Sequence, residues 1–452
     1  MAFLSFLPRV SLRRPDSVFS PLSLRQNFLW TLMGNAAYAG SRFLVLVILA
    51  KLGTAEMIGQ FALGVAISMP VMAFTDLQLV TVMVTDVNRS YEVGDYLGLR
   101  ILTTGAGILI ILGIVSTLGY SLEKTLVILL ITLDRAVSSL SSIFYGLFQQ
   151  HERMDFISTS GLIKSALSLS VISLLAYLTG SIVWICLGMA ASTVAASCLY
   201  DFRKGLLFTG TDPGGNPGGG ADAGAAIILR PRWLAPKLMK LAWVAFPLGC
   251  VFGLLSLNYN IPRFFIEKYW GARELGIFAA IYAPAAAGRF VLTAMGSAAS
   301  RRLAKYFTLG DRKAFVSLLC KLVGMAVLMG GVGIAIAALA GREILNLLYR
   351  PEYAEYSGTF LWLMAATAVS YMGIYMGYAI TAARRFWTQI PLVALMGAVS
   401  TSACYFLIPS HGISGAAISE LITQLSALAV SIIVVLYAVR YSSKIEDGPG
   451  PL

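Results

Sequence analysis

Three polar side chains share one face of a strongly apolar stretch near the start of the chain. Asn35, Tyr38 and Arg42 lie in the run "GNAAYAGSRFLVLVILAKLG" at residues 34–53, and a helix brings positions three, four and seven apart to one side. An arginine at bilayer depth is costly unless it is paired or faces a polar cavity. A guanidinium fork also binds phosphate oxygens. The spacing therefore predicts either a phosphate-binding site or an internal ion pair.

Polar positions with similar spacing recur further along the chain. Asn260 and Arg263 lie on one face of an apolar run, and Tyr282 and Arg289 align across two turns of the next. Arg263 lies near the outer end of its run, where it can also reach the lipid headgroups. If these faces point inward, they converge on a weakly cationic cavity that suits a diphosphate. The candidate substrate-binding residues are Asn35, Tyr38, Arg42, Asn260, Arg263, Tyr282 and Arg289.

Three acids lie deep in apolar runs, namely Asp76, Asp134 and Glu420. Acids at this depth carry ions in many transporters, so each is a candidate for ion coupling. They can equally pair with the arginines as staples between helices. Arg135 is the sequence neighbour of Asp134 and can neutralise it. Both interpretations remain open for Arg42 and Arg289.

Composition places the whole chain in the membrane. Of 452 residues, 58% are hydrophobic and 12% are charged, whereas soluble domains carry about 25% charged residues. The five cysteines show no CxxC spacing, which excludes a cysteine zinc site. Two histidines leave little for histidine-based catalysis. We therefore predict no enzyme activity, no catalytic residue, no metal and no cofactor.

Runs of about 20 apolar residues mark membrane spans, and each must be a helix because lipid offers the backbone no hydrogen-bond partners. The chain is predicted to be an all-α polytopic membrane protein. Its twelve spans are 27–50, 59–82, 98–119, 125–148, 157–178, 182–202, 240–265, 275–298, 315–340, 358–382, 389–408 and 412–439.

The basic residues orient these spans. If the N-terminus is cytoplasmic, most lysines and arginines, with Arg100 and Lys164 among them, fall in segments on the inner side. The outer segments hold Lys51, Lys124, Lys268, Arg273, Arg342 and Arg350. The positive-inside rule then predicts two cytoplasmic termini. Topology and anionic membrane lipids account for the net charge of +12, so no nucleic-acid partner is required.

A glycine- and proline-rich stretch, "GTDPGGNPGGGADAGAA", divides the spans into two sets of six. Such a composition is typical of a flexible linker. The predicted organisation is a cytoplasmic segment (1–26), a six-helix bundle (27–202), a cytoplasmic linker (203–239), a second six-helix bundle (240–439) and a cytoplasmic tail (440–452).

The two halves resemble each other. The turn after the first span reads "LGTAEMIGQFALGVA", and the turn after the seventh reads "WGARELGIFAAIYA". Both contain Gly-x-x-Glu, a further Gly and then Phe-Ala. Each follows a helix with an Arg-Phe pair, at Arg42 and at Arg263. Six spans in each half give the halves the same orientation, which predicts a parallel repeat about an axis along the membrane normal.

These segments, with "LLYRPEYAEYSGTFLWLMAA" and "LIPSHGISGAAISELI", resemble a known family. They are similar to the polysaccharide-biosynthesis flippases, which translocate lipid-linked O-antigen and exopolysaccharide units and belong to the MOP superfamily with the MATE drug antiporters. The resemblance covers about residues 25 to 440. It implies a MATE-like fold in the bacterial inner membrane and a role in surface polysaccharide, including lipopolysaccharide, assembly.

The resemblance implies a function and its partners. The substrate would be a polyprenyl-diphosphate-linked anionic glycan that crosses the membrane by alternating access, and polysaccharide polymerase and export proteins would be further partners. One alternative is a MATE-like cation-coupled drug exporter, which would need acids and aromatic rings along its path. The other is a membrane polysaccharide polymerase or ligase. Such an enzyme needs an outer domain to seat the glycan, and the longest outer segment, 341–357, is short.

Overall fold

The computed structural model describes residues 21–86, 90–208, 231–286, 288–383 and 389–441, and these residues form helices joined by short turns. Within this part of the chain, 10 helices are long and apolar enough to cross a membrane. One of them, at residues 390–439, covers two predicted spans, and another, at residues 235–286, covers one span and the first part of the next. The predicted all-α polytopic fold is therefore confirmed.

Side-chain caps determine where several helices of the first half begin. Ser23, Thr54 and Ser121 each accept a hydrogen bond from the backbone N–H three residues later, which satisfies one of the free donors of a helix start. The helices of this half are α1 (Leu24–Leu52), α2 (Ala55–Thr75), α3 (Leu79–Thr85), α4 (Val93–Leu118), α5 (Leu122–Gln150), α6 (Met154–Thr179), α7 (Ile182–Ala196), a π-helical segment (Ser197–Phe202) and α8 (Arg203–Phe208).

Two helices of the second half bend sharply at glycines. Gly271 (φ 80°) and Gly412 (φ 59°) have the positive φ that glycine adopts without strain, so α10 and α14 each turn back at these residues. The helices of this half are α10 (Ala235–Ala286), α11 (Arg289–Thr308), α12 (Arg312–Leu348), a 3₁₀ helix (Pro351–Tyr356), α13 (Ser357–Ala382) and α14 (Gln389–Tyr441).

The predicted non-membrane segments lie mostly outside the described residues. This holds for residues 1–20 of the N-terminal segment, 209–230 of the linker and 442–452 of the tail. The ends of the predicted linker are helical, because α8 continues to Phe208 and α10 begins at Ala235. Phe208 packs in an apolar cluster with Phe148 and Phe156. Burial of this side chain explains why helix extends beyond the predicted span.

The second span of each half is interrupted, which the hydropathy pattern does not show. In the first half, α2 ends at Thr75, and Leu77 (φ 50°) and Gln78 (φ 49°) adopt the left-handed conformation before α3 begins. In the second half, the predicted span 275–298 is divided between the end of α10 and α11. Apolar composition predicts burial in the membrane, but it does not report where a helix breaks.

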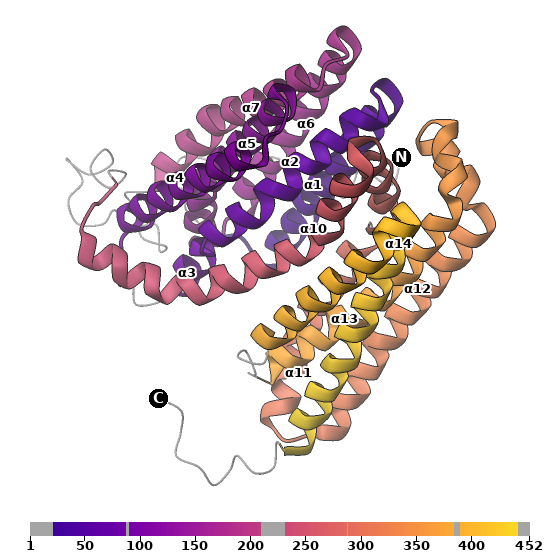
Figure 1. Ribbon diagram of the computed structural model, residues 1–452. Coiled ribbons are helices and arrows are strands. Elements are labelled where there is room, and N and C mark those ends of the chain that lie inside the picture. The colour runs from indigo at the N-terminus through magenta and orange to yellow at the C-terminus, as the bar shows by residue number, and fades with distance from the viewer. Residues whose placement is uncertain (1–20, 87–89, 209–230, 287, 384–388, 442–452) are drawn as a thin grey trace, which may run out of the picture.

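Helix α10 packs against both halves of the molecule, as Figure 1 shows by its course from the α3–α4 region towards α13 and α14. Its first turns bury Leu238 and Leu241 in an apolar cluster formed by the first half. Further along, the Asn258 amide donates to the Val393 carbonyl at 2.8 Å, and the Trp270 indole donates to the Ile408 carbonyl at 2.9 Å. The two halves are therefore connected mainly through α10.

The two turns that revealed the repeat meet in the structure. A Cβ atom on Gly59 would overlap the carbonyl oxygen of Ala272, and one on Gly276 would overlap that of Ala55. Small residues let two helices approach closely in a membrane. Gly59 and Gly276 are equivalent positions of the repeat, so the close crossing of α2 and α10 is itself symmetric.

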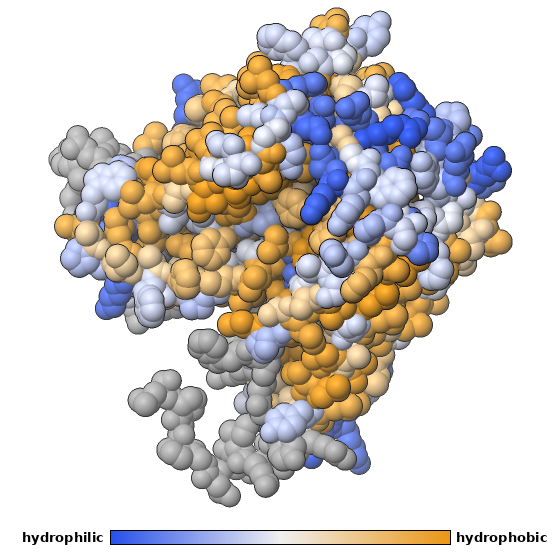
Figure 2. Space-filling view, viewed as in Figure 1, coloured by the Kyte–Doolittle hydropathy of each residue, from blue (hydrophilic) through white to orange (hydrophobic). Residues whose placement is uncertain are grey.

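Apolar side chains cover the flanks of both halves in Figure 2, and hydrophilic side chains gather towards the upper right of that view. Large exposed hydrophobic residues occur on many helices, with Leu109 70%, Trp243 79% and Leu339 85% exposed. A soluble protein seldom exposes such surfaces. They fit a molecule whose flanks contact lipid.

Candidate functional site

The polar face predicted for the first span exists, and it faces α5 and α6. On α1, the Arg42 guanidinium donates to the Tyr38 hydroxyl at 3.2 Å and lies 5.2 Å from the centre of that ring. Arg135 of α5 donates to the same hydroxyl at 3.5 Å. The helical spacing of Tyr38 and Arg42 therefore produces the contact that the sequence predicts.

Asp134 lies between these two arginines. Its carboxylate is 3.8 Å from Arg42 and 3.8 Å from Arg135, and its side chain is 2% exposed. The Thr193 hydroxyl of α7 donates to it at 2.6 Å. Neither arginine is within hydrogen-bonding distance, and the Arg42 side chain remains 33% exposed. One acid thus faces two cations, which leaves this cluster positively charged.

Two adjoining cavities follow the polar face of α1. The smaller has a volume of about 40 Å³ and is lined by Arg42, Asp134 and Thr193. The larger has a volume of about 280 Å³ and includes Asn35 in its wall. Both are lined by Tyr38, Ser138 and Lys164. Asn35, Tyr38 and Arg42 therefore belong to one polar region inside the first half.

A second ion pair, which the sequence pattern did not reveal, supports this region. Lys164 of α6 lies 2.7 Å from the fully buried Asp201 carboxylate and donates to the Tyr145 hydroxyl at 2.9 Å. Asp201 lies in the π-helical segment, and such segments are frequent at functional sites. Both residues fall within predicted spans, at 157–178 and 182–202. A lysine and an acid within two predicted spans could have indicated this pair, but the predicted topology assigned Lys164 to the cytoplasmic charges.

The second half contains a cluster of similar composition. Arg263 donates to the Asn260 amide oxygen at 3.0 Å, and the Arg289 guanidinium lies 4.8 Å from the centre of the Tyr259 ring. Tyr282 and Glu420 both interact electrostatically with Arg263 and Arg289. The structure therefore brings together four of the predicted binding residues from the second half with one predicted acid.

Glu420 itself resembles Asp134 in its surroundings. It is 7% exposed and accepts a hydrogen bond from Gln424 at 2.8 Å, four residues later on α14. Each half thus combines one buried acid with two arginines and a tyrosine. Tyr38–Arg42–Phe43 and Tyr259–Arg263–Phe264 also have identical spacing. The repeat therefore extends to the polar residues and places one cationic cluster in each half.

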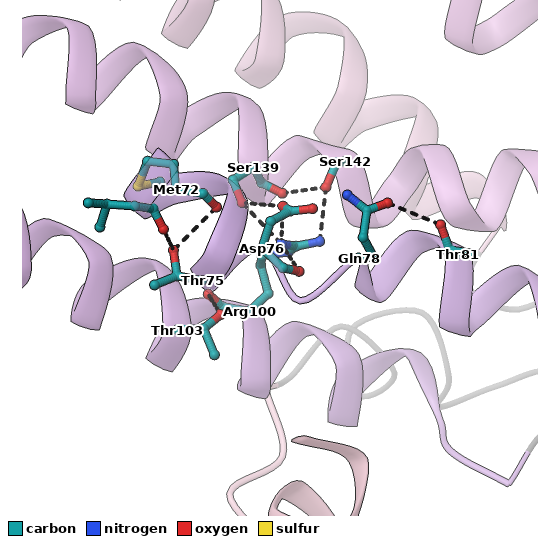
Figure 3. Close-up of polar contacts among 10 residues, drawn as sticks. Met72, Thr75, Asp76, Gln78, Thr81, Arg100, Thr103, Ser139 and Ser142 are labelled. Carbon is teal, nitrogen blue, oxygen red and sulfur yellow. Dashed lines mark hydrogen bonds and ion pairs between the residues drawn. The ribbon is translucent and has the colours of Figure 1, made fainter. Parts of the chain in front are cut away.

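Asp76, the third predicted acid, lies apart from both clusters. It ends α2, and its carboxylate and backbone carbonyl both accept hydrogen bonds from Arg100, whose side chain is fully buried (Figure 3). Ser139 donates to the same carboxylate at 3.1 Å. This contact holds the break between α2 and α3. Arg100 is therefore a buried structural partner and not, as its place in the sequence predicts, a charge of the cytoplasmic side.

Comparison with known sequences places the chain among proteins of polysaccharide synthesis. Residues 24–301 match the family described as polysaccharide biosynthesis protein. The capsular polysaccharide biosynthesis protein CapF of Staphylococcus aureus is 25% identical over 418 residues, which cover 89% of this chain and 97% of that protein.

Comparison with solved structures identifies the fold as that of the MATE transporters. An inward-facing MATE transporter of the MOP superfamily has a TM-score of 0.69 at 12% identity, over 90% of this chain and 95% of its own. An outward-facing MATE transporter has a TM-score of 0.60 at 10% identity, over 96% and 100%. A MOP superfamily transporter from Pyrococcus furiosus has a TM-score of 0.62 at 11% identity, over 97% and 100%.

Proposed function

Since the chain belongs to the polysaccharide biosynthesis protein family, we propose that it is a flippase for polyprenyl-diphosphate-linked oligosaccharide units, which it moves across the cytoplasmic membrane for surface polysaccharide assembly. Family and fold together identify a multi-pass membrane transporter of polysaccharide synthesis. The identity of the cargo rests on the chemistry of the two polar clusters.

The excess of arginine over acid in each cluster is the observation that carries this proposal. Arg42 and Arg135 face Asp134, and Arg263 and Arg289 lie near Glu420. Two planar guanidinium groups beside a single carboxylate retain donors for phosphate oxygens. A path for cationic drugs would instead need an excess of acids. The diphosphate of a lipid-linked glycan is the anion that fits this charge.

Movement of the two halves against each other provides a route for such a substrate. The anionic headgroup and its sugars enter between the bundles, and the prenyl chain stays in lipid. Helix α10 packs on both halves and contains Pro247 and Pro262, each of which removes a backbone hydrogen bond. Bending of α10 at these prolines would let the bundles open alternately to each side, as in other repeat-built transporters.

The proposed setting follows from the basic residues and the family. Both termini face the cytoplasm of a bacterial cell, the protein lies in the inner membrane, and polymerase and export proteins act on the glycan afterwards. In exopolysaccharide, capsule or O-antigen assembly alike, the flippase step precedes chain completion on the outer side. These assignments are part of the proposal.

Deletion of the gene distinguishes the proposed flippase from the two alternatives. Loss of a flippase abolishes surface polysaccharide and leaves lipid-linked units on the inner leaflet, where an impermeant glycosidase added outside cannot reach them. Loss of a polymerase leaves single units that this glycosidase does reach. Loss of a drug exporter leaves surface polysaccharide intact. Complementation with the wild-type chain must restore the polysaccharide.

A further inference from the structure

The larger cavity of the first half has a lining unlike that of the arginine clusters. Its wall includes the hydroxyls of Thr31, Ser138 and Ser158 and the amide of Asn35. These groups carry no charge. Thr31 and Ser158 already donate to the backbone carbonyls of Asn27 at 2.8 Å and Trp30 at 2.6 Å, so their oxygens can accept from a ligand. The cavity has a volume of about 280 Å³, and the same wall includes the apolar side chains of Met154 and Ile157.

The one ammonium group in this wall is already neutralised. Lys164 lies 2.7 Å from Asp201, which is fully buried behind the wall, and it also donates to Tyr145. Tyr145 in turn shares a hydrogen bond of 2.7 Å with Ser160. Lys164 is therefore fixed in place and contributes little net charge to the cavity. An acidic ligand gains no strong partner here.

Hydroxyls, an amide and apolar side chains together match the chemistry of a sugar ring, which carries hydroxyl groups around its edge and C–H groups on its faces. Pockets for small molecules typically combine an apolar lining with a few placed polar groups in this manner. A phosphate would find no unpaired cation in this wall, and a lipid chain would cover the amide of Asn35 and the hydroxyl of Ser138 without offering either a hydrogen-bond partner.

The larger cavity lies next to the cluster of Arg42 and Arg135. It adjoins the pocket of Arg42 and Asp134, and Tyr38 and Ser138 belong to both linings. Tyr38 is 44% exposed, so the region is open to a ligand along α1. A sugar attached directly to a diphosphate at Arg42 would fall within this cavity.

We propose that the cavity between α1, α5 and α6 binds the first sugar of the lipid-linked unit and selects for a neutral ring there. The inference rests on the proposed function, because it takes the diphosphate at Arg42 as its neighbour. It adds a specificity site that is distinct from the arginines.

Gly161 offers a way to fill the cavity without disturbing the fold. It lies in the cavity wall on α6, and a Cβ atom at this position would meet nothing within 4 Å. Gly161→Phe should therefore place a ring in the cavity. Gly113→Phe is the matched control, because Gly113 is exposed in the last third of α4 with the same free space and lines neither cavity.

The experiment measures dissociation constants of two probes for the full-length chain in lipid nanodiscs: polyprenyl diphosphate, and polyprenyl diphosphate carrying one neutral hexose. We expect the wild type and Gly113→Phe to bind the glycosylated probe about tenfold more tightly. Gly161→Phe should abolish this preference and leave the affinity for bare polyprenyl diphosphate unchanged. Asn35→Ala, which removes one amide, should reduce the preference in part.

The outcomes separate this inference from the proposed function. If the wild type binds both probes with equal affinity, the sugar site is excluded and the diphosphate site stands. The sugar site is also excluded if Gly161→Phe weakens binding of both probes equally. If the wild type binds neither probe, the proposed function itself is wrong, and the inference falls with it.

Discussion

At the scale of single residues, the structure shows how arginines at membrane depth are accommodated. Asp134 lies 3.8 Å from both Arg42 and Arg135, so it compensates the two charges without a hydrogen bond to either. A staple would show close contact between one cation and one acid, as Lys164 and Asp201 do at 2.7 Å. The charge of Arg42 is therefore only partly compensated, and its guanidinium retains N–H donors for a ligand.

Replacing Arg42 distinguishes a ligand role from a structural role. Arg42→Ala should leave the protein level unchanged, because Arg135 still faces Asp134, but it should abolish surface polysaccharide. Arg42→Lys should restore part of the function, since a point charge lacks the bidentate fork. The measurements are membrane protein level and surface polysaccharide. If Asp134→Asn restores the function of Arg42→Ala, the ligand role is contradicted and Arg42 is a staple.

The ion pair of Asp76 and Arg100 should behave differently. The Arg100 side chain is fully buried, whereas that of Asp76 is 27% exposed, so loss of Asp76 leaves the more deeply buried charge unpaired. Asp76→Ala should cost about 3–5 kcal/mol, and Arg100→Met should cost less. Thermal unfolding in detergent measures both changes.

The double variant tests the predicted ion-coupling role of Asp76. Asp76→Leu combined with Arg100→Met replaces the pair by apolar side chains and should recover most of the stability. Transport should persist if the pair is only structural. A stable double variant without transport would show instead that Asp76 carries the coupling ion.

At the scale of elements, the sequence predicted the existence of the helices better than their ends and breaks. Each of the 10 helices that are long and apolar enough to cross a membrane, in the described part of the chain, coincides with at least one predicted apolar run, because burial in lipid requires both length and hydrophobicity. The break at Leu77 and Gln78 was not predictable, because it depends on the long-range contact of Asp76 with Arg100. The packing of α10 on both halves is likewise a tertiary property that no local pattern encodes.

The same limit applies to the candidate site. Helical spacing correctly placed Tyr38 with Arg42 on one face, because that relation is local. The pairing of Lys164 with Asp201 joins α6 to a segment of π-helix and was missed. Asp201 was the available signal, since it is an acid within the predicted span 182–202.

The crossing of α2 and α10 gives a prediction for a whole element. Gly59→Val should separate the two helices, because even a Cβ atom there would overlap the Ala272 backbone. The expected result is loss of transport with a lower unfolding temperature. Gly105→Val on α4 is the control, since a Cβ at Gly105 meets nothing within 4 Å. Unchanged transport in Gly59→Val would contradict the importance of this contact.

At the scale of the whole molecule, polar contacts near the crossing join the two halves. Lys124 at the start of α5 lies 2.6 Å from Glu267 of α10, and Arg350 donates to the Lys51 carbonyl at 3.3 Å. Predicted topology places all four residues at the outer ends of the spans. These contacts would close the outer side and must break when the transporter opens outward.

A crosslink across this contact should lock the molecule. Lys124→Cys with Glu267→Cys, in a variant without the five native cysteines, should form a disulfide under oxidation and stop transport reversibly. Reduction should restore activity, and each single cysteine variant should be insensitive to oxidant. Full transport by the oxidised, crosslinked protein would show that the outer ends do not separate.

Transbilayer movement of the proposed cargo in purified proteoliposomes is the direct assay of the proposed flippase activity. The cargo is a fluorescent polyprenyl-diphosphate hexose, and an impermeant quencher reports the fraction on the outer leaflet. Wild-type protein should move the probe between leaflets, and vesicles with Arg42→Ala combined with Arg289→Ala should match protein-free vesicles. Movement by this double variant at the wild-type rate, or no movement by the wild type, would contradict the proposed flippase function.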